Sequence, residues 1–261
     1  MNFSIIGSGN IASWLAYVIH RNGEKIDQVY SRCYTHASSL ATQYGAEPID
    51  DISRLNDRSD IYIFTLNDTA YHKVLKDVKF NMNLAVHTSG SLSQELFKGF
   101  ASHYGVIYPY QSISAGMDYS GITVPLCIEA DNEQTLAHLR HIAGSWTDQV
   151  YEIGEADRGY LHLAAVFSCN FVNALYGVGY DILKYRNIDP GIMKPLLQNT
   201  LQKLDFMSPS EAQTGPAVRH EFPIMEKHLG MLKIEELKEV YRLISSLIQE
   251  KNAENDNTDK V

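Results

Sequence analysis

The sequence predicts an α/β protein: a Rossmann-like, doubly wound and mostly parallel sheet, followed by an all-helical domain. Three observations predict it. An apolar run at the N-terminus breaks into a Gly-x-Gly-x-x-Ala turn that opens a helix, β-like and helical runs then alternate to about residue 153, and no strand pattern returns afterwards. We therefore predict a Rossmann-like domain over 1–154, a helical domain over 155–250 and a disordered tail over 251–261.

The glycine turn joins a first strand, 3–6, to a helix over 11–21. Gly7 permits a tight turn, Gly9 lets the backbone approach a pyrophosphate, and small Ala12 lets the helix pack against the strand. The free N–H groups of the helix then face the phosphates. We expect a dinucleotide site, while a purely structural loop and an S-adenosylmethionine site stay open as alternatives. The predicted cofactor-binding residues of the turn are Gly7, Ser8, Gly9, Asn10 and Ile11.

The second predicted strand, 26–31, indicates which dinucleotide is bound. A carboxylate at its end would accept hydrogen bonds from the ribose 2′-hydroxyl of NAD, but this chain has Ser31 and Arg32 there. A guanidinium can pair with a 2′-phosphate through two charge-assisted hydrogen bonds, helped by a hydroxyl. We therefore predict NADP as the cofactor; the alternative is that Arg32 is a solvated loop residue.

Later strands end in polar loops that should meet the glycine turn at one edge of the sheet. The strand 60–66 leads into Leu66 and Asn67, predicted to lie beside the cofactor's ribose, although helix capping would also explain Asn67. The strand 84–88 leads into Ser89, Gly90 and Ser91, which we place in the ligand crevice. Strands over 104–109, 123–130 and 149–153, with a helix over 132–143, complete the alternation.

Composition narrows the class of function. A net charge of −9 argues against a nucleic-acid surface, which needs clustered Lys and Arg. Cys33, Cys127 and Cys169 show neither zinc-ligand nor disulfide spacing, and no ligand pattern of histidines appears, so no metal is predicted. The N-terminus enters the first strand directly and no apolar run approaches the ~20 residues that span a bilayer. We expect a cytoplasmic protein without a membrane anchor.

Several motifs together resemble a known superfamily. They are the glycine turn, the Ser-Arg at 31–32, the segment His87-Thr88-Ser89-Gly90-Ser91-Leu92, Tyr108-Pro109-x-Gln111, the helix 161–166 with Asn170 after it, and Thr214-Gly215-Pro216-x-x-Arg219. The superfamily contains 6-phosphogluconate dehydrogenase, the β-hydroxyacid dehydrogenases, pyrroline-5-carboxylate reductase and deazaflavin-dependent NADP oxidoreductases. Nearly the whole chain except the tail resembles a bacterial family labelled NADP oxidoreductase, in which a Rossmann-like domain precedes a helical domain of unknown function.

The resemblance implies a nicotinamide and a small substrate in a crevice between the domains, a homodimer built by the helical domain, and substrate contact by Ser89, Gly90 and Ser91. One departure matters. The β-hydroxyacid dehydrogenases carry a catalytic Lys followed closely by Asn on the first long helix of the second domain, but the stretch 155–180 has no Lys. His162 and Asn170, eight residues apart, are the polar residues available there.

Reduction of a C=O or C=N bond needs a proton donor, and His162 is the first candidate because imidazole titrates near neutral pH. Ser89 is a candidate hydrogen-bonding partner, Asn170 is a candidate to orient the substrate or the nicotinamide amide, and Arg219 is a candidate to clamp a substrate carboxylate or phosphate. Each residue also has a structural alternative, in a buried polar contact or, for Arg219, in a turn and helix start.

The sequence therefore predicts an NADP(H)-dependent oxidoreductase acting on a small imine, ketone or hydroxy acid. The alternative is a sensor that binds NADP(H) without catalysis. Whether a deazaflavin takes the place of the organic substrate stays open, as do the substrate and the direction of reaction.

Overall fold

The structure, a computed structural model, describes residues 1–114 and 116–258. It divides into two compact units, Met1–Leu175 and the residues from Tyr176 onward, which are described separately. All the strands lie in the first unit, and the last of them ends at Glu152. The first unit continues beyond position 154, where the sequence places a domain boundary, because it includes the first turns of the long helix that follows.

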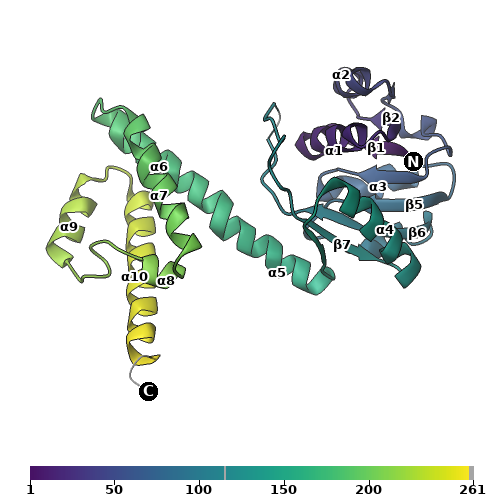
Figure 1. The fold of residues 1–261 in the computed structure, drawn as a ribbon. Coiled ribbons are helices and arrows are strands. Elements are labelled where there is room, and N and C mark those ends of the chain that lie inside the picture. The colour runs from purple at the N-terminus through teal and green to yellow at the C-terminus, as the bar shows by residue number, and fades with distance from the viewer. Residues whose placement is uncertain (115, 259–261) are drawn as a thin grey trace. The chain divides into compact units, whose positions relative to one another are not determined.

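The first unit contains one eight-stranded sheet in the order β3-β2-β1-β4-β5-β6-β7-β8 (Figure 1). Neighbouring strands are parallel except for β6 and β7, which are antiparallel. The first six strands follow the doubly wound order of dinucleotide-binding folds. The predicted fold class, a mostly parallel Rossmann-like sheet followed by helices, is confirmed. The strands are β1 (Asn2–Ile6), β2 (Lys25–Tyr30), β3 (Glu47–Ile49), β4 (Ile61–Phe64), β5 (Met82–His87), β6 (Ala101–Pro109), β7 (Leu126–Ala130) and β8 (Val150–Glu152).

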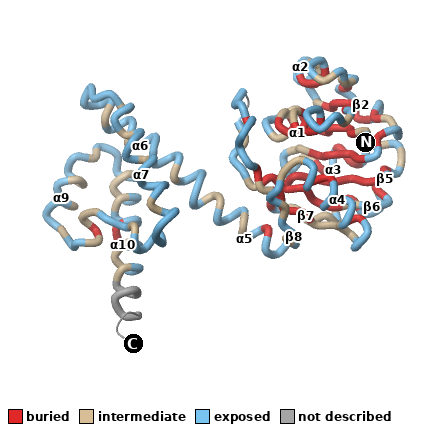
Figure 2. Tube along the Cα trace, in the orientation of Figure 1, coloured by how far each residue is buried: buried red, intermediate tan, exposed pale blue. Residues whose placement is uncertain are grey.

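The core lies on both faces of this sheet because successive side chains of a strand point to opposite sides. Phe3 and Ile5 of β1 belong to a cluster on one face, with apolar residues of α1 and α4, while Ile6 packs on the other face with Tyr71 of α3. Figure 2 shows the central strands buried along most of their length. The covering helices are α1 (Asn10–Arg21), α2 (Tyr34–Tyr44), α3 (Tyr71–Lys76) and α4 (Glu133–Trp146).

The rest of the described chain is helical. The elements are α5 (Glu155–Ala165), a π-helical segment (Val166–Phe171), α6 (Val172–Tyr185), α7 (Lys194–Gln202), α8 (Pro209–Ala212), α9 (Phe222–Met231) and α10 (Glu235–Thr258). Helix α10 extends to Thr258, and the predicted disorder of 251–261 stays a prediction. Residues 259–261 lie outside the described part of the chain.

The helical run Glu155–Tyr185 passes the length and composition test for a membrane span, with 31 residues and a mean hydropathy of 1.4 over its most apolar window. The expectation that no apolar run approaches this length is therefore wrong. The charged residues of the run, Glu155, Asp157, Arg158, Asp181 and Lys184, lie toward its two ends and leave an uncharged stretch between them. The same test is passed by helices of soluble proteins, and one such helix is weak evidence of a membrane.

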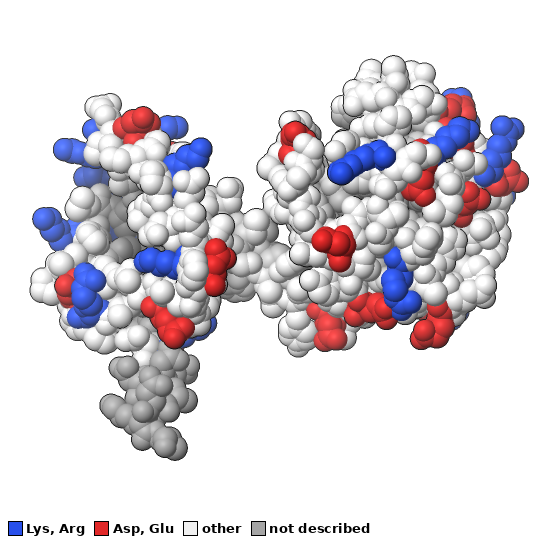
Figure 3. Space-filling view, in the orientation of Figure 1, with Lys and Arg blue, Asp and Glu red and all other residues white. Residues whose placement is uncertain are grey.

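Charged side chains are mixed in sign on the face drawn in Figure 3, where Lys and Arg alternate with Asp and Glu over both units. Such a mixture differs from the single basic stripe that tracks a phosphate backbone.

Candidate functional site

The carboxyl ends of β1, β4, β5 and β6 bring four loops to one edge of the sheet. β1 pairs with both β2 and β4, so the chain's direction of winding switches beside β1. Ligands of open α/β sheets bind at this switch point. The loops after β1, β4 and β5 contain the residues that the sequence predicts for the cofactor and substrate.

The glycine turn has the backbone that a phosphate site needs. Gly7 has φ +131°, and a Cβ there would lie 2.2 Å from Thr65 Oγ1, so no other residue fits between the strands. A Cβ on Gly9 would meet nothing within 4 Å, which leaves open space before α1. Gly9 is also the N-cap of α1 and no side chain caps it, so the first N–H groups of the helix are free for an anion.

The two residues after Gly9 attach α1 to other parts of the first unit. Asn10 donates a hydrogen bond from Nδ2 to the carbonyl of Ile113, 3.0 Å away, in the segment after β6. Ile11 is half-buried against the core. The Asn10 side chain therefore binds the segment that follows β6, while the backbone N–H of Asn10 lies at the start of α1.

The end of β2 offers a second anion-binding feature. Ser8 donates from Oγ to Ser31 Oγ at 2.9 Å, which joins the glycine turn to the end of β2. Arg32 is exposed and forms no ion pair with any residue that the structure describes. An unpaired guanidinium on the residue that follows Ser31 is chemically suited to a 2′-phosphate.

After β4, Leu66 packs against the core while Asn67 is exposed. Asn67 is the N-cap of a short 3₁₀ turn, but its side chain makes no capping hydrogen bond. The capping alternative therefore does not account for the Asn67 amide. The next residue, Asp68, accepts a short hydrogen bond from Ser91 Oγ and so connects the loops after β4 and β5.

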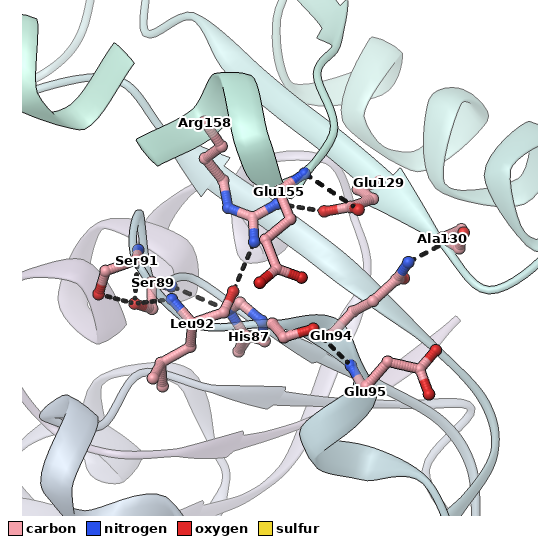
Figure 4. A network of polar contacts seen from close by, with 11 residues as sticks. His87, Ser89, Ser91, Leu92, Gln94, Glu95, Glu129, Ala130, Glu155 and Arg158 are labelled. Carbon is pink, nitrogen blue, oxygen red and sulfur yellow. Dashed lines mark hydrogen bonds and ion pairs between the residues drawn. The ribbon is translucent and has the colours of Figure 1, made fainter. Parts of the chain in front are cut away.

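The loop after β5 is held by the hydroxyl of Ser89 (Figure 4). Ser89 Oγ accepts from the backbone N–H groups of Ser91 and Leu92 at 3.1 and 3.2 Å, and it also contacts Ser91 Oγ at 3.2 Å. The hydroxyl therefore shapes the turn around Gly90. The structure brings Ser89, Gly90 and Ser91 together as the sequence predicts, with Ser89 mostly buried and Ser91 exposed.

His87 lies under this loop with no exposed surface. Its Nδ1 accepts the backbone N–H of Ser89 at 3.1 Å, so the neutral ring carries its proton on Nε2. Burial, and then the nearby charge of Arg158, lower the pKa of His87 to about 3. His87 is therefore a neutral support for the loop at physiological pH.

His162, on α5, faces the same loop. A Cβ on Gly90 would lie 2.9 Å from both Cγ and Nδ1 of His162, so only glycine lets the loop approach the ring this closely. His162 Nδ1 is 3.1 Å from the hydroxyl of Tyr108, on β6. His162 is exposed, and its Nε2 has no hydrogen-bond partner among the described residues.

The Tyr108 contact decides which nitrogen of His162 is available. Burial, with the nearby Cys127 thiol, raises the pKa of Tyr108 to about 12, so the hydroxyl keeps its proton at neutral pH. It donates to Nδ1 of a neutral ring and accepts from Nδ1–H of a charged one. In the charged ring, and in the neutral ring whose Nδ1 accepts from Tyr108, Nε2 carries a proton on the side away from Tyr108.

Asn170 lies in the π-helical segment, exposed and with no side-chain partner among the described residues. Eight residues of regular α-helix would turn its side chain by about 80° from that of His162. A π turn contains one extra residue, which reduces this angle by about 100° and leaves the two side chains within roughly 20° of one another. His162 and Asn170 therefore share one face of the helix.

Arg219 belongs to the second unit. Its Nη2 and Nε donate to the two carboxylate oxygens of Glu221 at 2.9 and 3.1 Å, and both side chains remain partly exposed. A substrate anion at Arg219 would have to compete with this neighbouring carboxylate.

Sequence reasoning missed the roles of two residues. The sequence places Tyr108 only in a family motif and gives Asp68 no role in the site. The available signal is position, since both residues lie near the C-terminal end of a strand at the ligand-binding edge. Among the residues that the structure describes, no group of His, Cys, Asp and Glu could hold a metal ion.

Two family models match the chain. Residues 2–88 match the NADP oxidoreductase, coenzyme F420-dependent model, and residues 124–248 match a domain of unknown function, DUF2520. The crystal structure of a "putative NADP oxidoreductase" from Bacteroides fragilis is 36% identical over 95% of this chain and 98% of that chain, with a TM-score of 0.91. The chain belongs to this family of NADP oxidoreductases.

More distant structures share the fold. The 1-pyrroline-5-carboxylate reductase of Streptococcus pyogenes is 17% identical and covers 97% of both chains, with a TM-score of 0.64. An imine reductase from Myxococcus stipitatus, in complex with NADP⁺, is 16% identical over 99% of this chain and 95% of that chain, with a TM-score of 0.62. No curated protein matches the chain. The family predicted from the sequence motifs is confirmed.

Proposed function

We propose that this oxidoreductase uses NADP(H) and exchanges a hydride with a small imine, ketone or hydroxy acid, with His162 as the proton donor or acceptor. The observation that carries the proposal is the Tyr108–His162 contact beside Gly90. It engages Nδ1 of His162 and leaves Nε2 without a partner among the described residues, at the edge of the sheet where Rossmann-like proteins bind their cofactor.

The residues at this edge fit the proposed cofactor. The uncapped start of α1 and the open space at Gly9 suit the pyrophosphate, and unpaired Arg32 with Ser31 suits the 2′-phosphate. Leu66 and Asn67 would lie beside the ribose. NADPH, when bound, supplies a hydride. The imine reductase relative is in complex with NADP⁺, which supports this choice. A deazaflavin is included among the hydride acceptors to be tested, because the matching family model is named for coenzyme F420.

The protein's own groups would complete the reaction. A charged His162 would give its Nε2 proton to the oxygen or nitrogen of the substrate as hydride reaches the adjacent carbon. The ring would become neutral with its proton on Nδ1, where the Tyr108 hydroxyl accepts it. Ser91 and the backbone around Gly90 would contact the substrate, and Asn170, on the same helix face as His162, would orient it or the nicotinamide amide. Arg219 would bind a substrate anion only if Glu221 releases it.

We also propose that the protein is a homodimer built by its helical unit. Large apolar side chains there are exposed, including Leu201 at 70%, Phe206 at 85% and Leu243 at 71%. A stable soluble protein covers such surfaces. The free thiols of Cys33, Cys127 and Cys169 suit a reducing compartment, so we place the dimer in the cytoplasm.

The first test is the thermal shift of the wild type and of Arg32→Ala with NADPH and with NADH. A ligand that binds the folded state raises its stability, so NADPH should raise the Tm and the variant should lose most of that shift. Arg21→Ala, which removes an arginine at the C-terminal end of α1 in the same unit, is the control and should keep the NADPH-induced shift. Absence of any shift with either nucleotide would reject the cofactor assignment.

The second test follows hydride transfer from NADPH labelled at C4 to panels of imines, ketones and a deazaflavin, and, in reverse, hydroxy acids. We expect transfer to one class and at least a tenfold loss in His162→Gln, with NADPH binding unchanged. His141→Gln, an exposed histidine on α4, serves as the control. Clear NADPH binding without transfer to any acceptor would favour the sensor instead.

A further inference from the structure

The first turn of α5 is anchored to the sheet by one carboxylate. The N-cap of α5 is Gly154, which has no side chain to cap the helix. Glu129, on β7, takes that role: its Oε1 accepts the backbone N–H of Glu155 at 3.1 Å. Its Oε2 accepts a short charge-assisted hydrogen bond from Nη1 of Arg158, one turn further along α5. The start of α5 is therefore fixed in both position and rotation relative to β7.

Arg158 carries this connection to the loop after β5. Its Nη2 donates to the carbonyl oxygen of Leu92, two residues beyond Gly90 (Figure 4). The side chain is 0% exposed, which is rare for arginine and requires that its charge be paired. The planar guanidinium holds two acceptors at a fixed separation, which the single ammonium of a lysine cannot do. One side chain thus joins α5, β7 and the loop.

We propose that Arg158 is a positioning residue for His162. The two residues are four apart on α5 and so lie on the same side of the helix. His162 packs against Gly90, and Arg158 holds Leu92 at the end of the same turn. Any displacement of the loop along α5 would therefore change the contact of the His162 ring with Gly90 and its hydrogen bond to Tyr108. The catalytic consequence rests on the proposed function, but the positioning itself does not.

The electrostatic surroundings agree with this role. Burial raises the pKa of Tyr108 and of Cys127, and the positive charge of Arg158 opposes this by lowering both. The charge of Arg158 therefore affects groups on β6 and β7. Glu129 balances that charge locally. Arg158 Nε is buried and has no hydrogen-bond partner among the described residues, which leaves the Nη1 and Nη2 contacts to hold the guanidinium.

The test compares Arg158→Lys and Glu129→Gln with Arg140→Lys in the full-length protein. Arg140 on α4 pairs with Glu152 at an exposed site of the same unit, with Nε 2.7 Å from the carboxylate, and controls for the loss of an arginine fork. The readout is the ring C–H resonance of His162, assigned with His162→Gln and followed through a pH titration by NMR. Steady-state kcat, KM and the thermal shift with NADPH are measured on the same samples.

We expect Arg158→Lys to change the His162 chemical shift and titration midpoint, and to lower kcat at least tenfold while the NADPH-induced shift in Tm stays within a degree of the wild type. Glu129→Gln should move the His162 signal in the same direction by less, since Leu92 keeps its donor. Arg140→Lys should leave every readout unchanged.

If Arg158 has only a structural role, Arg158→Lys will lower the Tm and leave the His162 titration as in the wild type. That result overturns the proposal. If Arg158→Lys does not fold, Glu129→Gln decides by the same criterion. A displaced His162 signal in a protein that reduces none of the tested acceptors would uphold the positioning role and reject the proposed reaction, so the two failures are distinguishable.

Discussion

At the scale of single residues, His87 makes stability depend on pH. Its pKa is lowered from 6.5 to about 3 by burial, so the unfolded chain takes up a proton below about pH 6.5 and the folded chain does not. Stability from this depressed pKa is complete above pH 6.5 and is lost as pH falls toward 3. The loss approaches about 1.4 kcal/mol per pH unit within this window.

His87→Asn removes this dependence while keeping an acceptor for the backbone N–H of Ser89. We expect the free energy of unfolding of the variant, measured with urea at pH 7, 6, 5 and 4, to fall less steeply than that of the wild type. The exposed His141→Asn is the matched control and should parallel the wild type. Parallel slopes for His87→Asn and the wild type would show that His87 titrates normally in the folded protein.

At the scale of elements, the π-helical segment sets which face of the helix carries Asn170. An alanine inserted after Ser168 would turn Asn170 by about 100° relative to His162. Deletion of Val172 in the same variant restores the rotation of the residues beyond it. We expect this paired variant to keep the wild-type mass in solution and its NADPH-induced thermal shift, and to lose at least tenfold in turnover.

The matched control for that variant is Asn170→Ala, which removes the amide without altering the helix. Its turnover should fall by a similar factor, and the two losses should not add, because both act on one contact. Wild-type turnover in the paired variant would mean that the rotation of Asn170 is irrelevant to the reaction.

At the scale of the whole molecule, the exposed apolar surface of the helical unit predicts association. Leu201 and Gln202 are neighbours at the end of α7, and both are exposed. Leu201→Glu should shift the protein from dimer to monomer in sedimentation equilibrium, because it places a charge in a surface that we expect to be buried. Gln202→Glu adds the same charge beside it and should leave the dimer intact. A wild-type protein that sediments as a monomer at micromolar concentration would contradict the dimer.

The sequence predicts those parts of the fold and site that depend on residues adjacent in the chain. The glycine turn, the strand and helix alternation and the polar loop at 88–91 each depend on a few adjacent residues, and the structure contains them. The contact of Tyr108 with His162 joins residues 54 positions apart. The burial of Arg158 arises from elements folding over it, and nothing in its immediate neighbours indicates it.

The π-helical segment shows a second limit. Its sequence, Val-Phe-Ser-Cys-Asn-Phe, has no proline or glycine to mark a change of helix. Eight residues at 3.6 per turn are roughly two turns, which already predicts nearly one face for His162 and Asn170. The structure adds the π turn, which brings the two side chains closer in phase than a regular helix would.

The extra residue of this π turn also affects how the chain is compared with its relatives. A homologue with a regular helix here has one residue fewer between the positions equivalent to His162 and Asn170. An ungapped alignment through the helix would then match every later position of α6 to the wrong neighbour, and catalytic residues transferred from such a relative would be displaced by one. A single gap placed within 166–171 restores the correspondence, so Asn170 should be compared with the Asn of distant relatives only after that gap has been introduced.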